Sequence, residues 1–466
     1  MGRTCLTPLL SLILIHPTND LCRRCTQYLT DCATRAPSLL AGSTSTLEAL
    51  ILACMHMARL NSNEDLETET RLSALEVIDT MIENVEIKKI LFMAENSGLF
   101  NTLLYGKDYI TTETDTGLIG LCIQAIVDDI DEDIRSWSEE KPSLQENVVW
   151  DEDDAAVFAE SLLERFIHAI GGKHSYAIIF PIIESLVQSP MWQRQRAALV
   201  ILEKCFNASP KSFVPHISVA VQSACYLANS DNMNPRVEWQ CVQLLGALCT
   251  EHVEMVQKPF SEKILGSIAR LISKNSCRKV VSHACLALVS FCRGSDNGSS
   301  NEEMGVIILP YLKDVLTALA SGPLAQNFSS PKALSPFNTV LIRALGAVAC
   351  LAVSVGEDFA PFYGDFMPGL LACAGIGLVL KGNVLEKTGD GHSDIASEEE
   401  MAQLRGAAVE AASIVGQAIG SDNRKMVSFA SVMFSFVVNM ILLIAFYSTN
   451  DTKENFLHLM QKELCL

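Results

Sequence analysis

The chain of 466 residues is 49% hydrophobic and carries a formal net charge of −19, with 54 acidic against 35 basic side chains. This charge argues against a protein that binds nucleic-acid phosphates and favours basic partners, because a large field attracts the opposite sign. Sixteen cysteines are too sparse for a disulfide scaffold and fit buried thiols in a reducing compartment.

Apolar residues recur at i, i+3, i+4 and i+7 along most of the chain, as in amphipathic helices, whereas alternating strand patterns are scarce. Near the amino end, the apolar residues 6–15 are short and contain Pro8, so we do not expect a signal peptide. The pair Cys22 and Cys25 forms a single CxxC motif without a second pair or an HxxxH motif. We therefore predict neither a metal site nor a cofactor.

A strongly acidic stretch follows, with twelve acidic residues between Asp128 and Asp154. Such a density of like charge predicts a solvated loop with at most short helix. We treat it as a candidate contact for a basic partner, with a purely solubilising role as the alternative. Its named members are Asp128, Asp129, Asp131, Glu132, Asp133, Asp151, Glu152, Asp153 and Asp154.

A repeat becomes visible beyond this stretch. The small residues Ala198, Cys241 and Ala284 lie 43 residues apart in similar helical patterns, each followed by apolar residues at +1, +3 and +4. We call such a small residue a mark, and the helix that carries it a marked helix. A period of this length, with a partner helix before each marked helix, is typical of HEAT repeats. We predict an all-α fold, an α-α superhelix (solenoid) of HEAT/armadillo-type repeats, whose units bury their apolar stripes against each other. Cys241 and Cys249 then pack as small apolar residues, and no enzyme activity is expected.

Similar marks occur outside the regular region. Ala344 lies 60 residues beyond Ala284, Ala408 a further 64, and Ala74 lies 124 before Ala198, close to three periods. We predict N-terminal HEAT-like repeats over 1–127, the acidic loop over 128–155 and three regular repeats over 156–293. Further repeats are expected over 294–422, with polar insertions at 294–304, 321–336 and 381–400, before a divergent apolar tail over 423–466.

Within that tail, residues 426–448 form a stretch of 23 residues without a charge. By length alone this stretch qualifies as a transmembrane segment. Three interpretations stay open: a gene-model error or translated non-coding extension, a buried repeat helix, or a membrane anchor. We do not expect membrane binding, because a helical solenoid has no need of an anchor and Asn439 lies in mid-span.

Several segments in order resemble the karyopherin-β (importin-β) superfamily, nearest its importin-five (karyopherin beta three) branch. They are "SPMWQRQRAALVIL", "NPRVEWQCVQLLG", "VVSHACLALVSF", "FAPFYGDFMPGLL" and "QLRGAAVEAASIVGQAIG", within a resemblance over residues 6–422. It implies a transport receptor that shuttles between cytoplasm and nucleus, and that binds basic cargo such as ribosomal proteins or histones, Ran-GTP and phenylalanine–glycine nucleoporins. Family members are about twice this length, so the main Ran-binding end is expected to be missing. The alternative is a HEAT-repeat scaffold that organises a complex without transport.

The resemblance also implies that the marked helices line a concave cargo-binding face. Helical geometry puts offsets near −2, +2, +5 and +9 from each mark on the side away from the packed stripe. Carboxylates, amides and an indole there suit an extended basic peptide; the alternatives are an ordinary solvated face and, for Trp239, plain packing. The candidates are Glu76, Asp79, Glu203, Asn207, Trp239, Gln243, Glu410 and Ser413.

Overall fold

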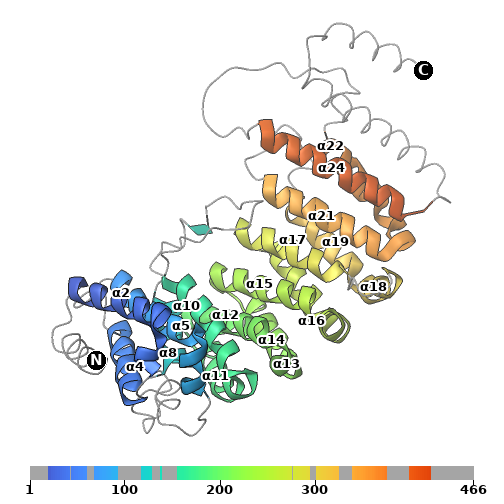
Figure 1. Cartoon of the computed structure of the whole chain (residues 1–466). Coiled ribbons are helices and arrows are strands. Elements are labelled where there is room, and N and C mark those ends of the chain that lie inside the picture. The colour runs from blue at the N-terminus through green and yellow to red at the C-terminus, as the bar shows by residue number, and fades with distance from the viewer. Residues whose placement is uncertain are drawn as a thin grey trace. The chain divides into compact units, whose positions relative to one another are not determined.

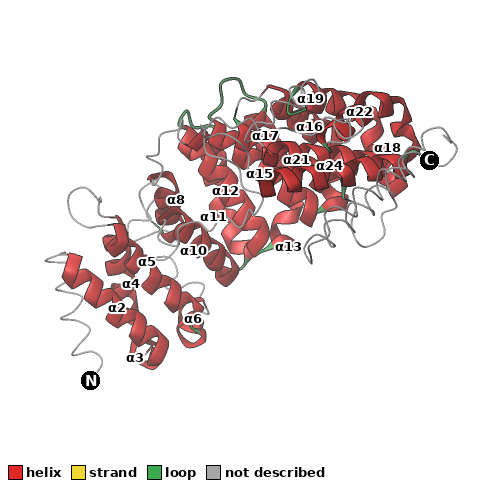
Figure 2. Cartoon of the chain, turned by 90° about the horizontal axis from the view of Figure 1, so that it is seen from above, coloured by secondary structure: helices red, strands yellow, loops and turns green. Residues whose placement is uncertain are grey.

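The computed structural model describes residues 19–41, 44–59, 68–92, 117–128, 137–138, 155–274, 277–293, 301–324, 338–374 and 398–420. Within these ranges the secondary structure is helical throughout, with short turns and no strand (Figure 2). The chain divides into two compact units. The first comprises residues 1–267 and 277–283, and the second comprises residues 268–276 and 284–466.

The first unit contains two rows of helices (blue to green in Figure 1). One row consists of α2 (Asn19–Arg35), α5 (Thr68–Glu83), α10 (Ala155–Ile170), α12 (Trp192–Ala208) and α15 (Pro235–Glu251), each of which packs on the next. We call it the inner row. It contains the marked helices of this unit.

The partner helices of the second row pack on members of the inner row. They are α4 (Thr44–Arg59) on α5, α8 (Leu118–Asp128) on α10, α11 (Gly172–Val187) on α12, and α14 (Ile217–Ala228) on α15. Shorter elements connect them: α3 (Pro37–Ala41), α6 (Val85–Phe92), α13 (Pro210–Phe213) and η2 (Val214–His216). This is the predicted arrangement of helical pairs.

The separation of Ala74 and Ala198 is close to three periods. Among the described helices, α5 packs directly on α10, and α10 on α12, so one inner-row helix lies between the two that carry these residues. The additional length lies around α8 and α10, including the acidic stretch that separates them in sequence.

Helix α15 illustrates how the sequence determines an element. It begins at Pro235, whose missing N–H costs nothing in the first turn, and the Asn234 side chain caps it by accepting a hydrogen bond from the Arg236 N–H at 2.9 Å. Cys241 and Cys249 are fully buried on its packed face. Burial raises the pKa of the Cys241 thiol well above its usual value. These thiols therefore pack as apolar groups, because the reactive thiolate is disfavoured.

Helices α16 (Val253–Lys274) and α17 (Arg278–Cys292) each contribute residues to both units. The second unit continues with α18 (Asn301–Ile308), η3 (Leu309–Tyr311), α19 (Leu312–Ser321), α21 (Asn338–Val355), η5 (Gly356–Phe362), α22 (Tyr363–Cys373) and α24 (Glu398–Ala418). Helix α24 packs on α21 and α22, and its marked residue Ala408 is fully buried. The Ser354 hydroxyl donates to the Cys292 carbonyl at 3.3 Å and so links α21 to α17.

Two described stretches of the second unit, Glu303–Ser321 and Thr339–Cys373, are long and apolar enough to cross a membrane by length and composition. The second stretch is largely buried within the protein, as core helices of soluble proteins also are, so this is weak evidence of a membrane segment. The uncharged residues 426–448, and most of the predicted polar insertions, lie outside the residues that the structure describes.

Candidate peptide-binding groove

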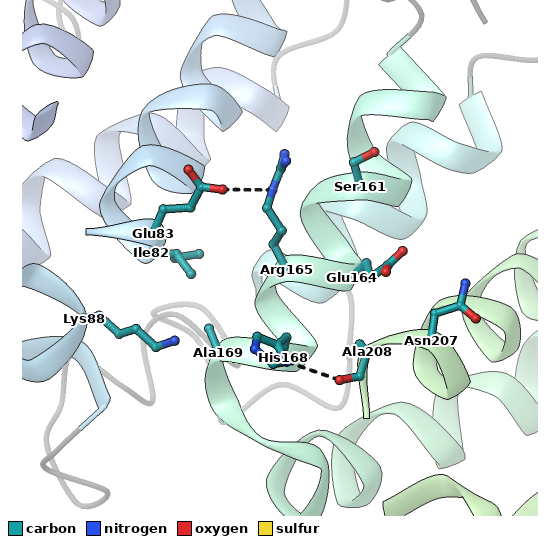
Figure 3. A pocket seen from close by; sticks show the side chains of 10 residues that line it. All are labelled: Ile82, Glu83, Lys88, Ser161, Glu164, Arg165, His168, Ala169, Asn207 and Ala208. Carbon is teal, nitrogen blue, oxygen red and sulfur yellow. Dashed lines mark hydrogen bonds and ion pairs between the residues drawn. The ribbon is translucent and has the colours of Figure 1, made fainter. Parts of the chain in front are cut away.

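A hollow of about 500 Å³ opens among α5, α6, α10 and α12 in the first unit (Figure 3). Glu83 and Lys88 approach it from α5 and α6, whereas Glu164 and Arg165 approach it from α10. Its lining therefore mixes acidic and basic side chains. The full lining is Ile82, Glu83, Lys88, Ser161, Glu164, Arg165, His168, Ala169, Asn207 and Ala208.

A two-pronged ion pair supports the wall of this hollow. The Arg165 Nε donates to Asp79 Oδ1 at 2.8 Å, and a terminal nitrogen of the same guanidinium lies 2.7 Å from Asp79 Oδ2. Arg165 Nε also lies 3.8 Å from Glu83 Oε1. Burial nevertheless raises the pKa of Asp79 to about 6, since desolvation outweighs the attraction of Arg165.

The acidic residues of α10 are partly engaged by bases from α12. Glu160 Oε1 lies 3.6 Å from Arg196, and its other carboxylate oxygen lies 3.6 Å from Lys204 Nζ. Lys204 Nζ also lies 3.9 Å from Glu164. Because these carboxylates already have cations beside them, the first hollow offers a basic ligand less than its acidic residues suggest.

A second hollow of about 250 Å³ lies between α12 and α15. Two carboxylates, Glu203 and Glu251, line it together with His252, and no described lysine or arginine does. The remaining lining is Phe206, Asn207, Pro210, Leu244, Ala247 and Leu248, and Asn207 also lines the first hollow. We call the two hollows together the groove.

The electrostatics of the second hollow are set mainly by burial. Burial raises the pKa of Glu203, while Lys204 beside it acts in the opposite direction. The Glu203 Oε2 accepts a hydrogen bond from Gln240 Nε2 at 2.9 Å, which orients the carboxylate. Burial also lowers the pKa of His252, so its ring is disposed to be neutral.

The lining of the second hollow has the chemical character that suits a lysine or arginine side chain. An apolar surface next to carboxylates can cover the aliphatic stem while the carboxylates bind the charged end, since long basic side chains separate these two characters. The side-chain amide of Asn207 lies between the hollows and can bond the backbone of an extended chain.

The predicted binding residues occupy different environments. Glu76 and Asn207 are exposed, while Glu203, Trp239 and Gln243 are half-buried on α12 and α15. Asp79 departs from the expectation of an open groove position, because it is 7% exposed and its carboxylate is bound by Arg165. In the second unit, α24 places Glu410 exposed and Ser413 half-buried.

The predicted acidic loop is described only at its two ends and at residues 137–138. Asp128 is the last residue of α8, and Trp137 and Ser138 are described within the stretch. The other named acidic residues lie outside the described part of the chain. They are Asp129, Asp131, Glu132, Asp133, Asp151, Glu152, Asp153 and Asp154.

Sequence reasoning missed several groups of the groove. Glu251 lies one position beyond the +9 offset from Cys241, and a wider window would have included it. Glu164 and Arg165 lie on α10, which received no mark because the acidic stretch interrupts the period before it. Trp137 carried no signal beyond being an aromatic residue in an acidic segment.

Comparisons with known proteins identify relatives of this architecture. No family model matches the chain. Importin subunit beta-3 from Saccharomyces cerevisiae is 23% identical over 363 residues, which cover 77% of this chain and 27% of the relative. The chain thus spans about a quarter of the length of this curated relative.

Solved structures agree with that similarity. Kap121p bound to RanGTP aligns with a TM-score of 0.68 at 22% identity, covering 97% of this chain and 36% of that one. Kap121p bound to Pho4p aligns with a TM-score of 0.67 at 21% identity, covering 96% of this chain and 37% of that one. The predicted all-α repeat fold and the resemblance to the karyopherin-β superfamily are confirmed.

Proposed function

We propose that the chain is the cargo-binding part of a nuclear transport receptor of the karyopherin-β type. It binds extended basic segments, of the kind found in ribosomal proteins and histones, along the groove of the first unit. The observation that carries this proposal is the second hollow, which Glu203 and Glu251 line together with apolar side chains. The similarity to importin subunit beta-3 supports the assignment.

The physical fit is that of a lysine-rich chain in extended conformation. A net charge of −19 attracts such a chain over a distance, and the two hollows then accept alternate side chains on either side of Asn207. Charge-assisted hydrogen bonds to Glu203 and Glu251 supply the specificity for a cation. This role needs no catalytic group.

The other partners belong to the whole receptor. Kap121p has been solved bound to RanGTP, and we extend to this chain a Ran-dependent release of cargo, contacts with phenylalanine–glycine nucleoporins, and shuttling between cytoplasm and nucleus. Because the chain spans only about a quarter of its curated relative, binding of a cargo peptide is tested without Ran-GTP.

The test is a titration of the full chain with a fluorescent lysine-rich peptide at two salt concentrations. Glu203→Gln and Glu251→Gln are each expected to weaken binding by about tenfold, because hydrogen bonds to charged groups contribute about 1.5–3 kcal/mol. Affinity of the parent chain should fall as salt rises, since exposed charges are screened.

Glu184→Gln is the matched control, because Glu184 is an exposed acid on α11 outside the groove lining. It changes the net charge equally and should leave affinity nearly unchanged. Equal losses in all three variants would mean that only the overall charge attracts the peptide. Undiminished affinity in the two groove variants would reject the proposal and favour the scaffold alternative, in which the inner row is only structural.

A further inference from the structure

An aromatic and cationic cluster joins the amino-terminal ends of α15 and α17 in the first unit. The indole of Trp239 lies edge-on to Trp137, with ring centroids 6.1 Å apart and an interplanar angle of 83°. Lys279 Nζ lies 4.7 Å from the centroid of the Trp137 ring, and the Arg236 guanidinium carbon lies 5.2 Å from it. Both distances are within the range of a cation–π interaction.

The cluster is organised by a hydrogen bond that does not involve Trp137. The Trp239 Nε1–H donates to His283 Nδ1 at 2.7 Å, and His283 is 7% exposed. The Lys279 carbonyl oxygen also lies 3.1 Å from Nδ1, but an indole N–H can only donate, so Nδ1 acts as the acceptor. This bond fixes the Trp239 ring in its T-shaped arrangement with Trp137.

Trp137 reaches this cluster from a distant part of the sequence. It belongs to the acidic stretch between α8 and α10, which has Glu132, Asp133, Glu139 and Glu140 but also Arg135 and Lys141 within five positions of it. Arg236 and Lys279 lie in the first turns of α15 and α17, where the helix dipoles add to their charge, whereas Glu238 in the first turn of α15 is buried. The sequence segment that carries Trp137 is therefore opposite in net charge to the two cations beside its ring.

We propose that Arg236, Trp239, Lys279 and His283 form a binding site for a tryptophan side chain carried on an acidic segment, and that Trp137 is its ligand in this structure. We call it the indole site. An acidic peptide with a tryptophan competes for the same surface. The site also reassigns Trp239, since Arg236 and Lys279 repel the basic peptide for which Trp239 was a predicted ligand. The indole site does not depend on the proposed transport function.

The first test uses a glutamate-specific protease on the full chain, with cleavage after Glu139 and Glu140 as the readout. Trp137→Ala is expected to accelerate this cleavage about tenfold, and Lys279→Gln about threefold, because each removes part of the cation–π and ring contacts that hold Trp137. The variant that carries both changes should be cleaved no faster than Trp137→Ala alone, because Lys279 acts through Trp137. Lys274→Gln, at an exposed position near the end of α16, is the matched control and should cleave like the parent chain.

The second test adds a labelled peptide of residues 132–142 to the parent chain and to Trp137→Ala. Since the site is vacated in the variant, the peptide should bind it at least about tenfold more tightly than the parent chain. Replacement of the peptide tryptophan by alanine should abolish that difference.

The proposal would be overturned if Trp137→Ala were cleaved at the rate of the parent chain. It would also be overturned if the effects of Trp137→Ala and Lys279→Gln on the cleavage rate were additive. Equal peptide binding by parent and variant would overturn it too. If Trp137→Ala has a lowered melting temperature, Lys279→Gln against Lys274→Gln decides the question alone. Titration with the lysine-rich peptide is a separate measurement, so failure of the indole site and failure of the groove are distinguishable.

Discussion

Replacing Asp79 by asparagine tests whether desolvation or ion pairing dominates beneath the groove. The Asp79 carboxyl has a pKa of about 6, against an ordinary value of 3.8, although Arg165 binds both of its oxygens. Between these values the folded chain holds a proton that the unfolded chain has released. Stability from this group is therefore complete below pH 3.8 and is lost as the pH rises through 6.

The magnitude follows from the same two values. Linkage gives a loss of about 2 kcal/mol from this carboxyl between pH 4.5 and pH 7.5. Asparagine stays neutral and can still accept one hydrogen bond from Arg165. Asp79→Asn should therefore match the parent chain near pH 4.5 and exceed its stability by up to about 2 kcal/mol at pH 7.5.

The assay is urea unfolding of both chains, followed by circular dichroism across this pH range. Other carboxyl groups titrate in both chains, so the difference between them isolates Asp79. Asp231→Asn, at an exposed turn, controls for the loss of one acid from an acidic protein. A difference that is constant with pH, or that favours the parent chain increasingly as the pH rises, would refute the reasoning and show that Arg165 controls the titration.

Three other predictions test the packing and the groove. Arg165→Met should lower the free energy of unfolding by about 1–3 kcal/mol in urea unfolding. The loss should be smaller at pH 5 than at pH 7.5, because at pH 5 the Asp79 carboxyl is protonated in the folded state and leaves no unpaired charge. Gly171→Ala should lower the free energy of unfolding by about 1–3 kcal/mol, because Gly171 has a φ of 88°, which alanine adopts only with strain. Gly266→Ala, inside α16, should instead raise it by up to about 1 kcal/mol. The melting temperatures of the two variants are compared with that of the parent chain. Lysine-rich peptide should bind more weakly as the pH falls from 7 to 5 in fluorescence titrations, because the raised pKa of Glu203 brings its protonation closer to neutrality.

The fold was accessible to sequence reasoning because its information is local and repeated. Ala198, Cys241 and Ala284 are all fully buried, as small residues must be where two helices approach closely. A 43-residue period specifies the pairing of each helix with its neighbours without any long-range guess. Between Ala74 and Ala198 the sequence separation does not give the number of helices, because a long acidic stretch lies in sequence between α8 and α10.

The candidate site was harder to predict from the sequence, because the charge of a side chain does not reveal which residue it pairs with. Glu203 was found and lines the second hollow, but Asp79, selected by the same geometric rule, turned out to be paired with Arg165 from α10. That arginine lies 86 residues away in sequence. Helical offsets predict which way a side chain points, but the neighbouring helix decides whether its charge is already neutralised.

Trp239 shows why bulk charge does not assign a local ligand. A net charge of −19 suggests that the half-buried indole of Trp239 should receive a cation from a partner. The chain's own Arg236 and Lys279, however, lie over the ring of Trp137, which packs on Trp239. At these distances, nearby charges outweigh a field that salt screens within about 10 Å. The first unit therefore carries two distinct surfaces. Glu203 and Glu251 line a hollow together with apolar side chains between α12 and α15, and Arg236 and Lys279 lie beside an indole at the amino-terminal ends of α15 and α17.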